Sequence, residues 1–358
     1  MKTTVLHIID ALNRGGAEKL LVNVVNALDT DFENIVLYFS SPHDLRSEIK
    51  TAKIICLDIP FSVSKLPKIV SGIRKVIEQN NVSIVHSHSY WTNIAVRFVR
   101  TKKLTVIQSY HSAVYDTMWK SNIVKLLALI DKVTYRKSIK LIAVSDYVKS
   151  ILERKLKYKN VKVLRNFVEN PGIFNKECEN YTLGEKLKII SVGNIKKEKN
   201  HDLVVEAFYR DLKDKNVKFD IFGTGTELEK YRNDLKEKGI TNLQFKGQTS
   251  TVYEEMSKYN LFCMTSFSEA CPLTPLEAMK VKLPMLLSDI PGFKEIAGEN
   301  AVYFQSNNSD DLSDKINNII NGKIKLEVNT YLSDKILSQY SKVVYMNKLK
   351  DLYKKFGK

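Results

Sequence analysis

The chain has 358 residues, of which 44% are hydrophobic and 27% are charged, a composition typical of a soluble globular protein. This length is too great for one ordinary core and suits two domains of about 150–200 residues each. No segment approaches the ~18 uncharged apolar residues of a spanning helix, and the first apolar run lacks a cleavage-site pattern, so it predicts a strand rather than a signal peptide. The four cysteines form no CxxC pair, which predicts reduced thiols in a cytoplasmic protein.

The net charge of +16 is unevenly distributed along the chain. Residues 1–175 carry 27 Lys and Arg against 14 Asp and Glu, whereas residues 176–358 carry 29 against 26. This asymmetry predicts that the first half faces an anionic partner. A membrane surface, a phosphorylated acceptor and a nucleic acid are the candidates.

Short β-branched runs alternate with amphipathic helical patterns through the first half of the chain. The runs cover residues 3–10, 33–40, 53–60, 82–89, 104–111, 139–146 and 161–167. Two of the helical patterns between them span residues 17–28 and 65–80. Strands that alternate with helices predict a parallel sheet built from βαβ units.

A polar segment at 169–186, with Pro171, Gly172 and Gly184 and no periodicity, predicts a domain linker. The alternation then restarts with runs at 187–194, 217–225, 242–249, 261–268, 283–290 and 301–305. The tail predicts one or two helices. We therefore expect an α/β protein with two doubly wound domains, whose ligand crevices lie at the carboxyl ends of the strands and form one cleft if the domains face each other.

Two glycine-rich turns are candidates for ligand binding. Gly15 and Gly16 follow the first strand and precede a helix, where the missing side chains let backbone N–H groups approach a ligand. A flexible turn is the alternative, because neither a Walker motif nor a GxGxxG motif is present. The second turn, GTGTEL at 223–228, has Leu in place of a third Gly and is weak evidence for a dinucleotide site.

Three histidines and one lysine lie at predicted strand ends. His86 and His88 form an HxH pair, but no further cluster follows at ligand spacing, so we expect no metal site. His111 closes the next strand at the rim where ligands bind, with a hydrogen-bonded structural role as the alternative. Lys199 precedes a helix after the strand that ends at Gly193, and it can serve as a fixed charge for a phosphate.

The segment SFSEACPLTPLEAMKVKLPMLLSDIPG at 266–292 holds two carboxylates around two prolines. Its pattern predicts a capping box with Thr274 as the N-cap, Pro275 as the first helical residue and Glu277 as the third. Glu269 then lies at the end of the preceding strand. Free N–H groups around Leu273 and Thr274, together with the helix dipole, favour a diphosphate.

The two-glutamate segment, followed by Pro284 and DIPGFKEI, resembles the signature of retaining glycosyltransferases of family 4, the group 1 glycosyl transferases. Similar matches are GGAE at 15–18, VLRNF at 163–167 and VGN…KN at 192–200. The resemblance implies the GT-B fold, with two Rossmann-like domains facing across a cleft. Its acceptor-side domain would span residues 1–170 plus a returning helix at about 338–358, and its nucleotide-sugar donor domain would span residues 171–337.

The resemblance also implies roles for individual residues. Glu277 would bind the ribose hydroxyls of a nucleotide sugar, and Lys199 would neutralise its diphosphate. Glu269 would lie near the donor sugar, and His111 would contact the sugar that is transferred. The remaining donor-binding positions would be Gly15, Gly16, Asn194, Ala270, Cys271, Pro272, Leu273 and Thr274. No cofactor or bound metal is implied, because cationic side chains and helix N-termini do that work.

Two departures from the family pattern bear on the donor. Asn194 stands where the family commonly has Arg, so one phosphate-binding cation is missing there. Either Lys196 or Lys197 substitutes for it, or the leaving group is stabilised less strongly. Ala270 and Cys271 replace the usual Gly-Phe, which predicts a narrower sugar pocket.

We therefore expect a cytoplasmic enzyme that moves a sugar, with retention, from a UDP- or GDP-sugar to a growing, lipid-linked glycan in capsule, O-antigen or exopolysaccharide assembly. Apolar and basic residues mix at 111–137, which suits peripheral contact with the anionic cytoplasmic face of the inner membrane, although a core-facing helix is the alternative. A sugar-nucleotide epimerase or phosphorylase is the rival enzyme. A nucleic-acid-binding protein is disfavoured by the lack of a helix-turn-helix, zinc or RRM signature. A metal hydrolase is a third alternative, with His86 and His88 as its only candidate metal ligands.

Overall fold

The computed structural model of the chain describes residues 2–356, except positions 29, 100, 102–103, 118–120, 169–179 and 329. The chain divides into two compact units. The first unit comprises residues 1–167 and 342–358, and the second comprises residues 168–341. The sequence placed the same divisions at 170 and about 337, and most of its predicted linker lies outside the described residues. All thirteen predicted strands are present.

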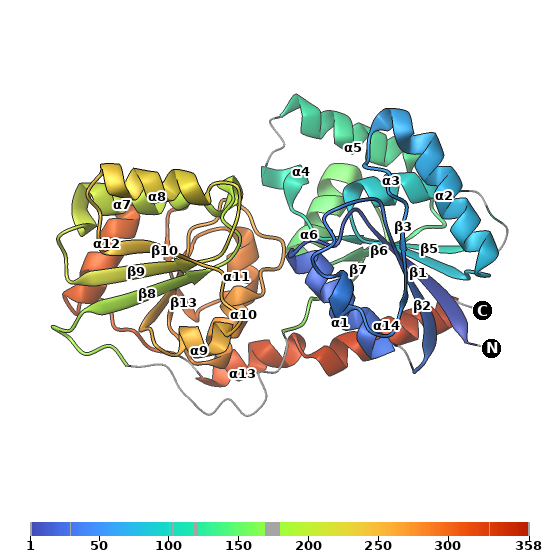
Figure 1. The fold of residues 1–358 in the computed structure, drawn as a ribbon. Coiled ribbons are helices and arrows are strands. Elements are labelled where there is room, and N and C mark those ends of the chain that lie inside the picture. The colour runs from blue at the N-terminus through green and yellow to red at the C-terminus, as the bar shows by residue number, and fades with distance from the viewer. Residues whose placement is uncertain are drawn as a thin grey trace. The chain divides into compact units, whose positions relative to one another are not determined.

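The first unit contains a parallel seven-stranded sheet in the order β3-β2-β1-β4-β5-β6-β7 (Figure 1). Its strands are β1 (Thr3–Ile9), β2 (Phe32–Tyr38), β3 (Lys53–Cys56), β4 (Ile84–Ser87), β5 (Thr105–Tyr110), β6 (Lys140–Ala143) and β7 (Lys162–Val163). Its helices are α1 (Gly16–Leu28), α2 (Leu66–Gln79), α3 (Tyr90–Phe98), α4 (Val114–Thr117), α5 (Asn122–Thr134), α6 (Asp146–Ile151) and α14 (Lys342–Phe356).

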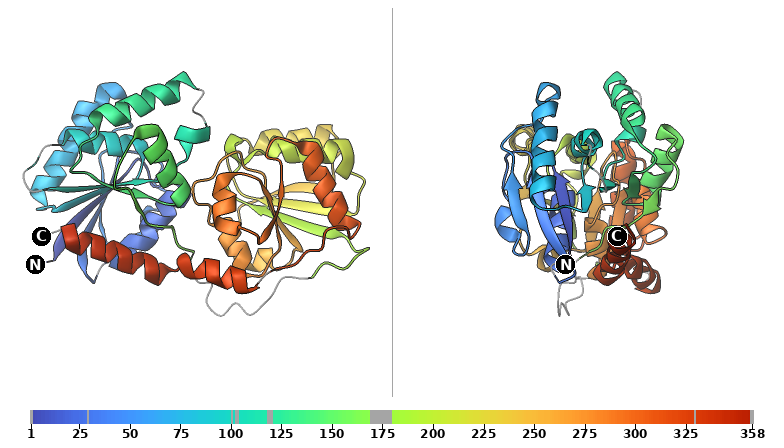
Figure 2. Two further views of the ribbon diagram at one scale, coloured as in Figure 1. Left: turned by 180° about the vertical axis from the view of Figure 1, so that it is seen from behind. Right: turned by 90° about the vertical axis from the view of Figure 1, so that its right-hand side faces the viewer.

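Alternation along each strand divides the first unit into two apolar layers. On β1, Val5 faces a core that includes α1 and α14, whereas Leu6 and Ile8 face a core that includes α2 and α3. Figures 1 and 2 show α14 running beside α1 along the same side of the sheet. The last helix of the chain therefore packs into the first unit, which confirms the expectation of a returning helix.

The second unit contains a parallel six-stranded sheet in the order β10-β9-β8-β11-β12-β13. Its strands are β8 (Leu187–Val192), β9 (Val217–Phe222), β10 (Leu243–Gly247), β11 (Leu261–Met264), β12 (Met285–Ser288) and β13 (Ala301–Phe304). Its helices are α7 (His201–Ala207), α8 (Leu228–Glu237), α9 (Val252–Met256), α10 (Thr274–Lys280), α11 (Pro291–Ala297), α12 (Ser309–Ile320) and α13 (Thr330–Gln339).

Both sheets reverse their strand order beside the first strand, between β1 and β4 in one unit and between β8 and β11 in the other. In open α/β sheets, ligands bind beyond the carboxyl ends of the strands at such a switch point. The loop that contains Lys199 follows β8, and the loop that contains Glu269 follows β11. The fold thus brings these two loops, about 70 residues apart in sequence, to the same place. Among the described residues, no helix is long and apolar enough to cross a membrane.

Candidate functional site

Lys199 and Glu269 form an ion pair at the switch point of the second sheet. The Lys199 Nζ lies 2.5 Å from the Glu269 Oε1, and the Ser266 hydroxyl donates to the same oxygen at 2.8 Å. Both charged side chains are largely shielded from solvent, with 23% and 13% exposed. The Thr265 hydroxyl donates to the Lys199 carbonyl at 2.9 Å, which ties the two loops together. The site therefore holds a lysine and a carboxylate in a fixed arrangement.

Three glycines let the backbone segments around this pair approach each other closely. A Cβ at Gly292 would lie 2.1 Å from the Glu269 carbonyl oxygen, so the Gly of DIPG lets α11 pack against the Glu269 loop. A Cβ at Gly223 or Gly225 would lie 1.8 or 2.1 Å from a carbonyl oxygen of the loop after β8. The glycines of GTGTEL therefore support the neighbouring loop by close packing.

The capping box predicted at Thr274 is wrong. Leu273 already has helical dihedrals (φ −84°, ψ −29°), so Thr274 is the first helical residue instead of the flanking one. The Thr274 hydroxyl donates to the Met264 sulfur at 3.1 Å, and the N-cap residue Leu273 makes no side-chain cap hydrogen bond. The residue that flanks α10 therefore offers no polar side chain to the N–H groups of the first turn.

Glu277 lies in this first turn and is partly buried. Burial raises the pKa of the Glu277 carboxyl to about 7, and the nearby Lys280 opposes this only in part. Burial removes part of the hydration of this carboxylate, and hydroxyl groups of a bound ligand would replace the lost hydrogen bonds from water.

His201, at the start of α7, is a candidate that sequence reasoning missed. Its ring is buried, neither ring nitrogen has a hydrogen-bond partner among the described residues, and burial lowers its pKa to about 4. It lines a small recess together with Gly193, Lys199 and Ser266. The only signal in the sequence is its position, two residues after Lys199.

In the first unit, Gly15 lies between β1 and α1, as the sequence predicted, whereas Gly16 is already the first residue of α1. The Gly15 carbonyl accepts a hydrogen bond from the Lys19 N–H at 3.0 Å, so Gly15 begins the helical hydrogen bonding of α1. A Cβ at Gly16 would meet nothing within 4 Å. The backbone therefore has open space beside Gly16, whereas a Cβ at Gly15 would lie 2.1 Å from the Glu18 Oε2.

His111 and Asp10 carry unpaired buried atoms at the carboxyl edge of the first sheet. His111 follows β5, both of its ring nitrogens lack a hydrogen-bond partner among the described residues, and burial lowers its pKa to about 4. Asp10 follows β1, its Oδ1 also lacks a partner, and burial raises its pKa to about 6 against an opposing hydrogen bond from Ser89. The sequence singled out His111 but not Asp10, although an acid just before a Gly-Gly turn was a usable signal.

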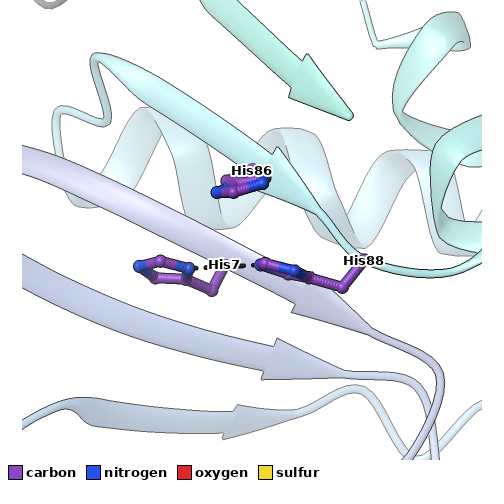
Figure 3. Close-up of side chains that lie close together, drawn as sticks. All are labelled: His7, His86 and His88. Carbon is purple, nitrogen blue, oxygen red and sulfur yellow. Dashed lines mark hydrogen bonds between the residues drawn. The ribbon is translucent and has the colours of Figure 1, made fainter. Parts of the chain in front are cut away.

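A buried group of three histidines lies on the face of the first sheet that α14 covers. His7 and His86 are register partners on β1 and β4, and His88 follows two residues later (Figure 3). One nitrogen from each ring lies within 4.8 Å of the others, so the three could hold a metal ion. Sequence reasoning saw only the HxH pair, because the strand register that adds His7 is a tertiary feature.

Hydrogen bonds within the protein already engage five of the six ring nitrogens of this group. The contacts are His7 Nδ1 to His88 Nε2 (3.3 Å), His7 Nε2 to Asn34 Oδ1 (3.3 Å), His86 Nδ1 to Tyr353 Oη (2.6 Å) and His86 Nε2 to Ser109 Oγ (2.7 Å). Burial lowers the pKa of all three imidazoles, to about 4 for His7. We interpret the group as a neutral hydrogen-bonded network that ties β1, β4 and α14 together.

Comparison with known proteins identifies the family. Residues 14–170 match Glycosyltransferase Family 4, and residues 175–335 match Glycosyl transferases group 1. This chain belongs to the family 4 glycosyltransferases. The O-antigen biosynthesis glycosyltransferase WbnH of Escherichia coli is 26% identical over 69% of this chain and 70% of its own. An α-1,4-N-acetyl-D-galactosaminyltransferase of Campylobacter jejuni that acts on an undecaprenol-linked glycan is 26% identical over 82% and 81%.

The fold of this glycosyltransferase agrees with that assignment. Anabaena HepE, whose crystal structure contains UDP-glucose, superposes with a TM-score of 0.77 at 13% identity, over 98% of this chain and 99% of that one. The expectation of a GT-B enzyme with two parallel-sheet domains is therefore confirmed. Of the predicted donor-binding positions, Asn194 falls in the loop after β8, residues 270–273 fall in the loop after β11, and Thr274 is the first residue of α10.

Proposed function

We propose that this glycosyltransferase moves a sugar, with retention of configuration, from a UDP- or GDP-sugar to a growing lipid-linked glycan in capsule, O-antigen or exopolysaccharide assembly. The ion pair between Lys199 and Glu269, in the loops that follow β8 and β11, carries the proposal. The relative from Escherichia coli is named for O-antigen biosynthesis, and the relative from Campylobacter jejuni for transfer to an undecaprenol-linked glycan. Both names support this class of acceptor.

On this proposal, Lys199 faces the donor diphosphate. Negative charge grows on the leaving nucleoside diphosphate as the glycosidic bond breaks, and a fixed ammonium group stabilises it without reorganisation. The first-turn N–H groups of α10 add a second positive region. Asn194 supplies no charge, so Lys199 carries more of this work than it would with the family's usual arginine nearby.

Glu277 binds the ribose hydroxyls, and Glu269 lies near the donor sugar, whose hydroxyls the backbone of residues 270–274 holds. In the first unit, the backbone at Gly16 is open to a ligand, whereas the Glu18 side chain occupies the space beside Gly15. His111 is neutral at pH 7, and its unpaired ring nitrogens can exchange hydrogen bonds with a sugar hydroxyl.

The proposed reaction is tested by its products. Thermal-shift screening with UDP-, GDP- and other nucleotide sugars identifies the donor, and release of free UDP or GDP is then followed with and without an acceptor glycan. Transfer predicts release that depends on the acceptor. A donor epimer formed without an acceptor would indicate an epimerase, and release that requires inorganic phosphate would indicate a phosphorylase.

We further propose that the enzyme needs no bound metal, because Lys199 and the start of α10 supply the positive charge. Treatment with EDTA followed by desalting should leave the initial rate within about twofold of the untreated rate. Loss of activity that Mg²⁺ or Zn²⁺ restores would contradict this. The same EDTA treatment is applied to His7→Gln, which alters the three-histidine group. If EDTA lowers the rate of the wild type but not of this variant, the metal acts at the histidine group and not at the donor site.

Replacing Glu277 by Gln should weaken donor binding about tenfold or more, because charge-assisted hydrogen bonds to the ribose are lost. The same change should stabilise the fold at pH 8. The folded-state pKa of about 7 lies above the ordinary value of 4.5, so wild-type stability falls as pH rises from about 4.5 to about 7. The glutamine has no such dependence, and it should gain about 2–3 kcal/mol at pH 8. Calorimetric donor titration and urea unfolding at pH 5 and pH 8 measure both effects.

The outer face of α5 is the membrane-contact surface in this proposal. Its apolar side chains are exposed rather than core-facing: Ile123 (70%), Leu126 (56%), Leu129 (56%) and Val133 (74%). Exposed Lys125 and Lys132 flank this stripe, while its acidic residue, Asp131, is buried. An apolar stripe flanked by lysines suits the anionic cytoplasmic face of a membrane, and on this proposal the basic charge meets lipid instead of nucleic acid.

The double substitution Leu126→Asp/Leu129→Asp should weaken binding to vesicles that contain phosphatidylglycerol about 100-fold, since it removes two inserting side chains worth ~1.5 kcal/mol each. Co-sedimentation measures the binding. The control is Val63→Asp/Val343→Asp, which makes the same change at two exposed valines elsewhere in the first unit (73% and 68% exposed). Equal loss in the two variants would contradict a role for α5.

A further inference from the structure

A groove of about 690 Å³ lies in the first unit, at the edge of its sheet where β6 and β7 begin. Lys140 and Lys162, the first residues of β6 and β7, are among its lining residues. The end of α14 closes it, and the Thr105 hydroxyl at the start of β5 holds that end by donating to the Phe356 carbonyl at 2.7 Å. The loops after β1 and β5 leave the other ends of these parallel strands, so the groove is separate from His111 and the Gly15-Gly16 turn.

The groove is strongly and uniformly positive. Seven of its seventeen lining residues are lysines, and none is Asp or Glu. The ammonium groups of Lys140, Lys162 and Lys355 lie 5.0, 5.5 and 5.9 Å from the centre of the Phe356 ring. None of the seven lysines forms an ion pair with a carboxylate of the described chain. Three like charges around one ring repel one another, and an anion bound between them would relieve that repulsion.

The walls of the groove are apolar and held in place. Tyr135 and Tyr158 pack with ring centres 4.3 Å apart, and Leu156 and Leu352 also line the groove. The Tyr158 hydroxyl donates to the buried Asp131 carboxylate at 2.7 Å, which fixes the ring. A concave site of this volume, with apolar walls and convergent charges, has the features of a small-molecule site more than of a solvated lysine surface.

We propose that this groove binds a phosphate-bearing anion. An acidic phospholipid headgroup and a soluble polyphosphate share this chemistry. Lys140, Lys162 and Lys355 contact the phosphate, and the tyrosine wall packs against the neighbouring apolar or ring-bearing part of the ligand. The proposal does not depend on the proposed glycosyl donor or acceptor.

The test compares three proteins. The groove variant is Lys140→Ala/Lys162→Ala/Lys355→Ala, and the control variant is Lys65→Ala/Lys68→Ala/Lys75→Ala, which removes the same charge from exposed positions before and on α2. One probe is phosphatidylcholine vesicles with and without phosphatidylglycerol, measured by co-sedimentation. The other is sodium tripolyphosphate, measured by calorimetry at 50 and 300 mM NaCl. If the groove variant unfolds, Lys157→Ala/Lys159→Ala on the exposed rim replaces it.

We expect the groove variant to bind one of the two probes about 100-fold more weakly than wild type does. This estimate assumes about a tenfold loss for each of the two best-placed lysines. The affinity of the control variant should stay within about threefold of wild type. Loss limited to vesicles identifies a lipid headgroup, and loss of one tripolyphosphate site identifies a soluble ligand. Any donor-site binding of tripolyphosphate is present in all three proteins and cancels. Equal losses in the two variants, or no binding of either probe by wild type, would overturn the proposal.

Discussion

Replacing Lys199 by Ala is expected to lower kcat/KM by about 10²–10³-fold, with most of the loss in kcat. In the proposed function, the interaction of Lys199 with the leaving diphosphate strengthens as charge develops there, so its removal raises the barrier more than it weakens ground-state binding. Initial rates of nucleoside diphosphate release, measured at several donor concentrations with saturating acceptor, separate the two contributions.

The neighbouring Lys197 provides a matched control, because it lies in the same turn but is exposed. Lys197→Ala should keep its activity within about twofold. A Lys199→Ala enzyme within threefold of wild type would exclude the diphosphate role.

A double variant at Lys199 and Glu269 separates the effect of Lys199 on kcat from its effect on donor affinity. In Lys199→Ala, the Glu269 carboxylate keeps its bond from Ser266 but loses its ammonium partner, and it then faces the donor diphosphate as an uncompensated like charge. The double variant Lys199→Ala/Glu269→Gln should recover part of the lost donor affinity but not the lost kcat. A coupling of about 0.5–3 kcal/mol in this cycle is the range expected for groups in direct contact.

The fold was predictable because its signals are local. Each strand lies in a short, mostly apolar run, β-branched in the first unit, so all thirteen could be placed to within a few residues. The parallel arrangement followed from the alternation with helices. The tail predicted helices, and only the resemblance to the family indicated that the last of them returns to the first unit.

Residues of the candidate site could be predicted only where the local sequence of a loop marks them. Lys199, Glu269 and Gly15 lie at strand ends that the sequence marks. The capping box failed at Thr274 because Leu273 had already entered the helix, and a one-residue shift of a helix start is beyond what a pattern can resolve. His7 joins His86 through strand register, and His201 becomes a candidate only because its ring is buried without a hydrogen-bond partner among the described residues. These are tertiary facts.

The largest stability effect also comes from a feature that the sequence does not reveal. Arg97 on α3 and Asp131 on α5 form an ion pair at 2.6 Å with both side chains 1% exposed. The same carboxylate accepts hydrogen bonds from the hydroxyls of Tyr110, Tyr115 and Tyr158 at 3.0, 2.6 and 2.7 Å. Each partner comes from a different part of the first unit, so Asp131 joins α5 to the sheet, to α4 and to the wall of the lysine groove.

Replacing Asp131 by Ala should therefore lower the free energy of unfolding by about 3–5 kcal/mol, because it leaves the Arg97 guanidinium buried without its counter-charge. Replacing the pair by Arg97→Met/Asp131→Leu, a change that is often neutral for buried pairs, should still cost about 3 kcal/mol or more, because three buried tyrosine hydroxyls would lose their acceptor. Urea unfolding measures both. Asp116→Ala, at a partly exposed pair with Arg154, is the control and should cost about 1 kcal/mol or less. A double variant as stable as wild type would mean that the tyrosines find other partners, and that Asp131 serves only to neutralise Arg97.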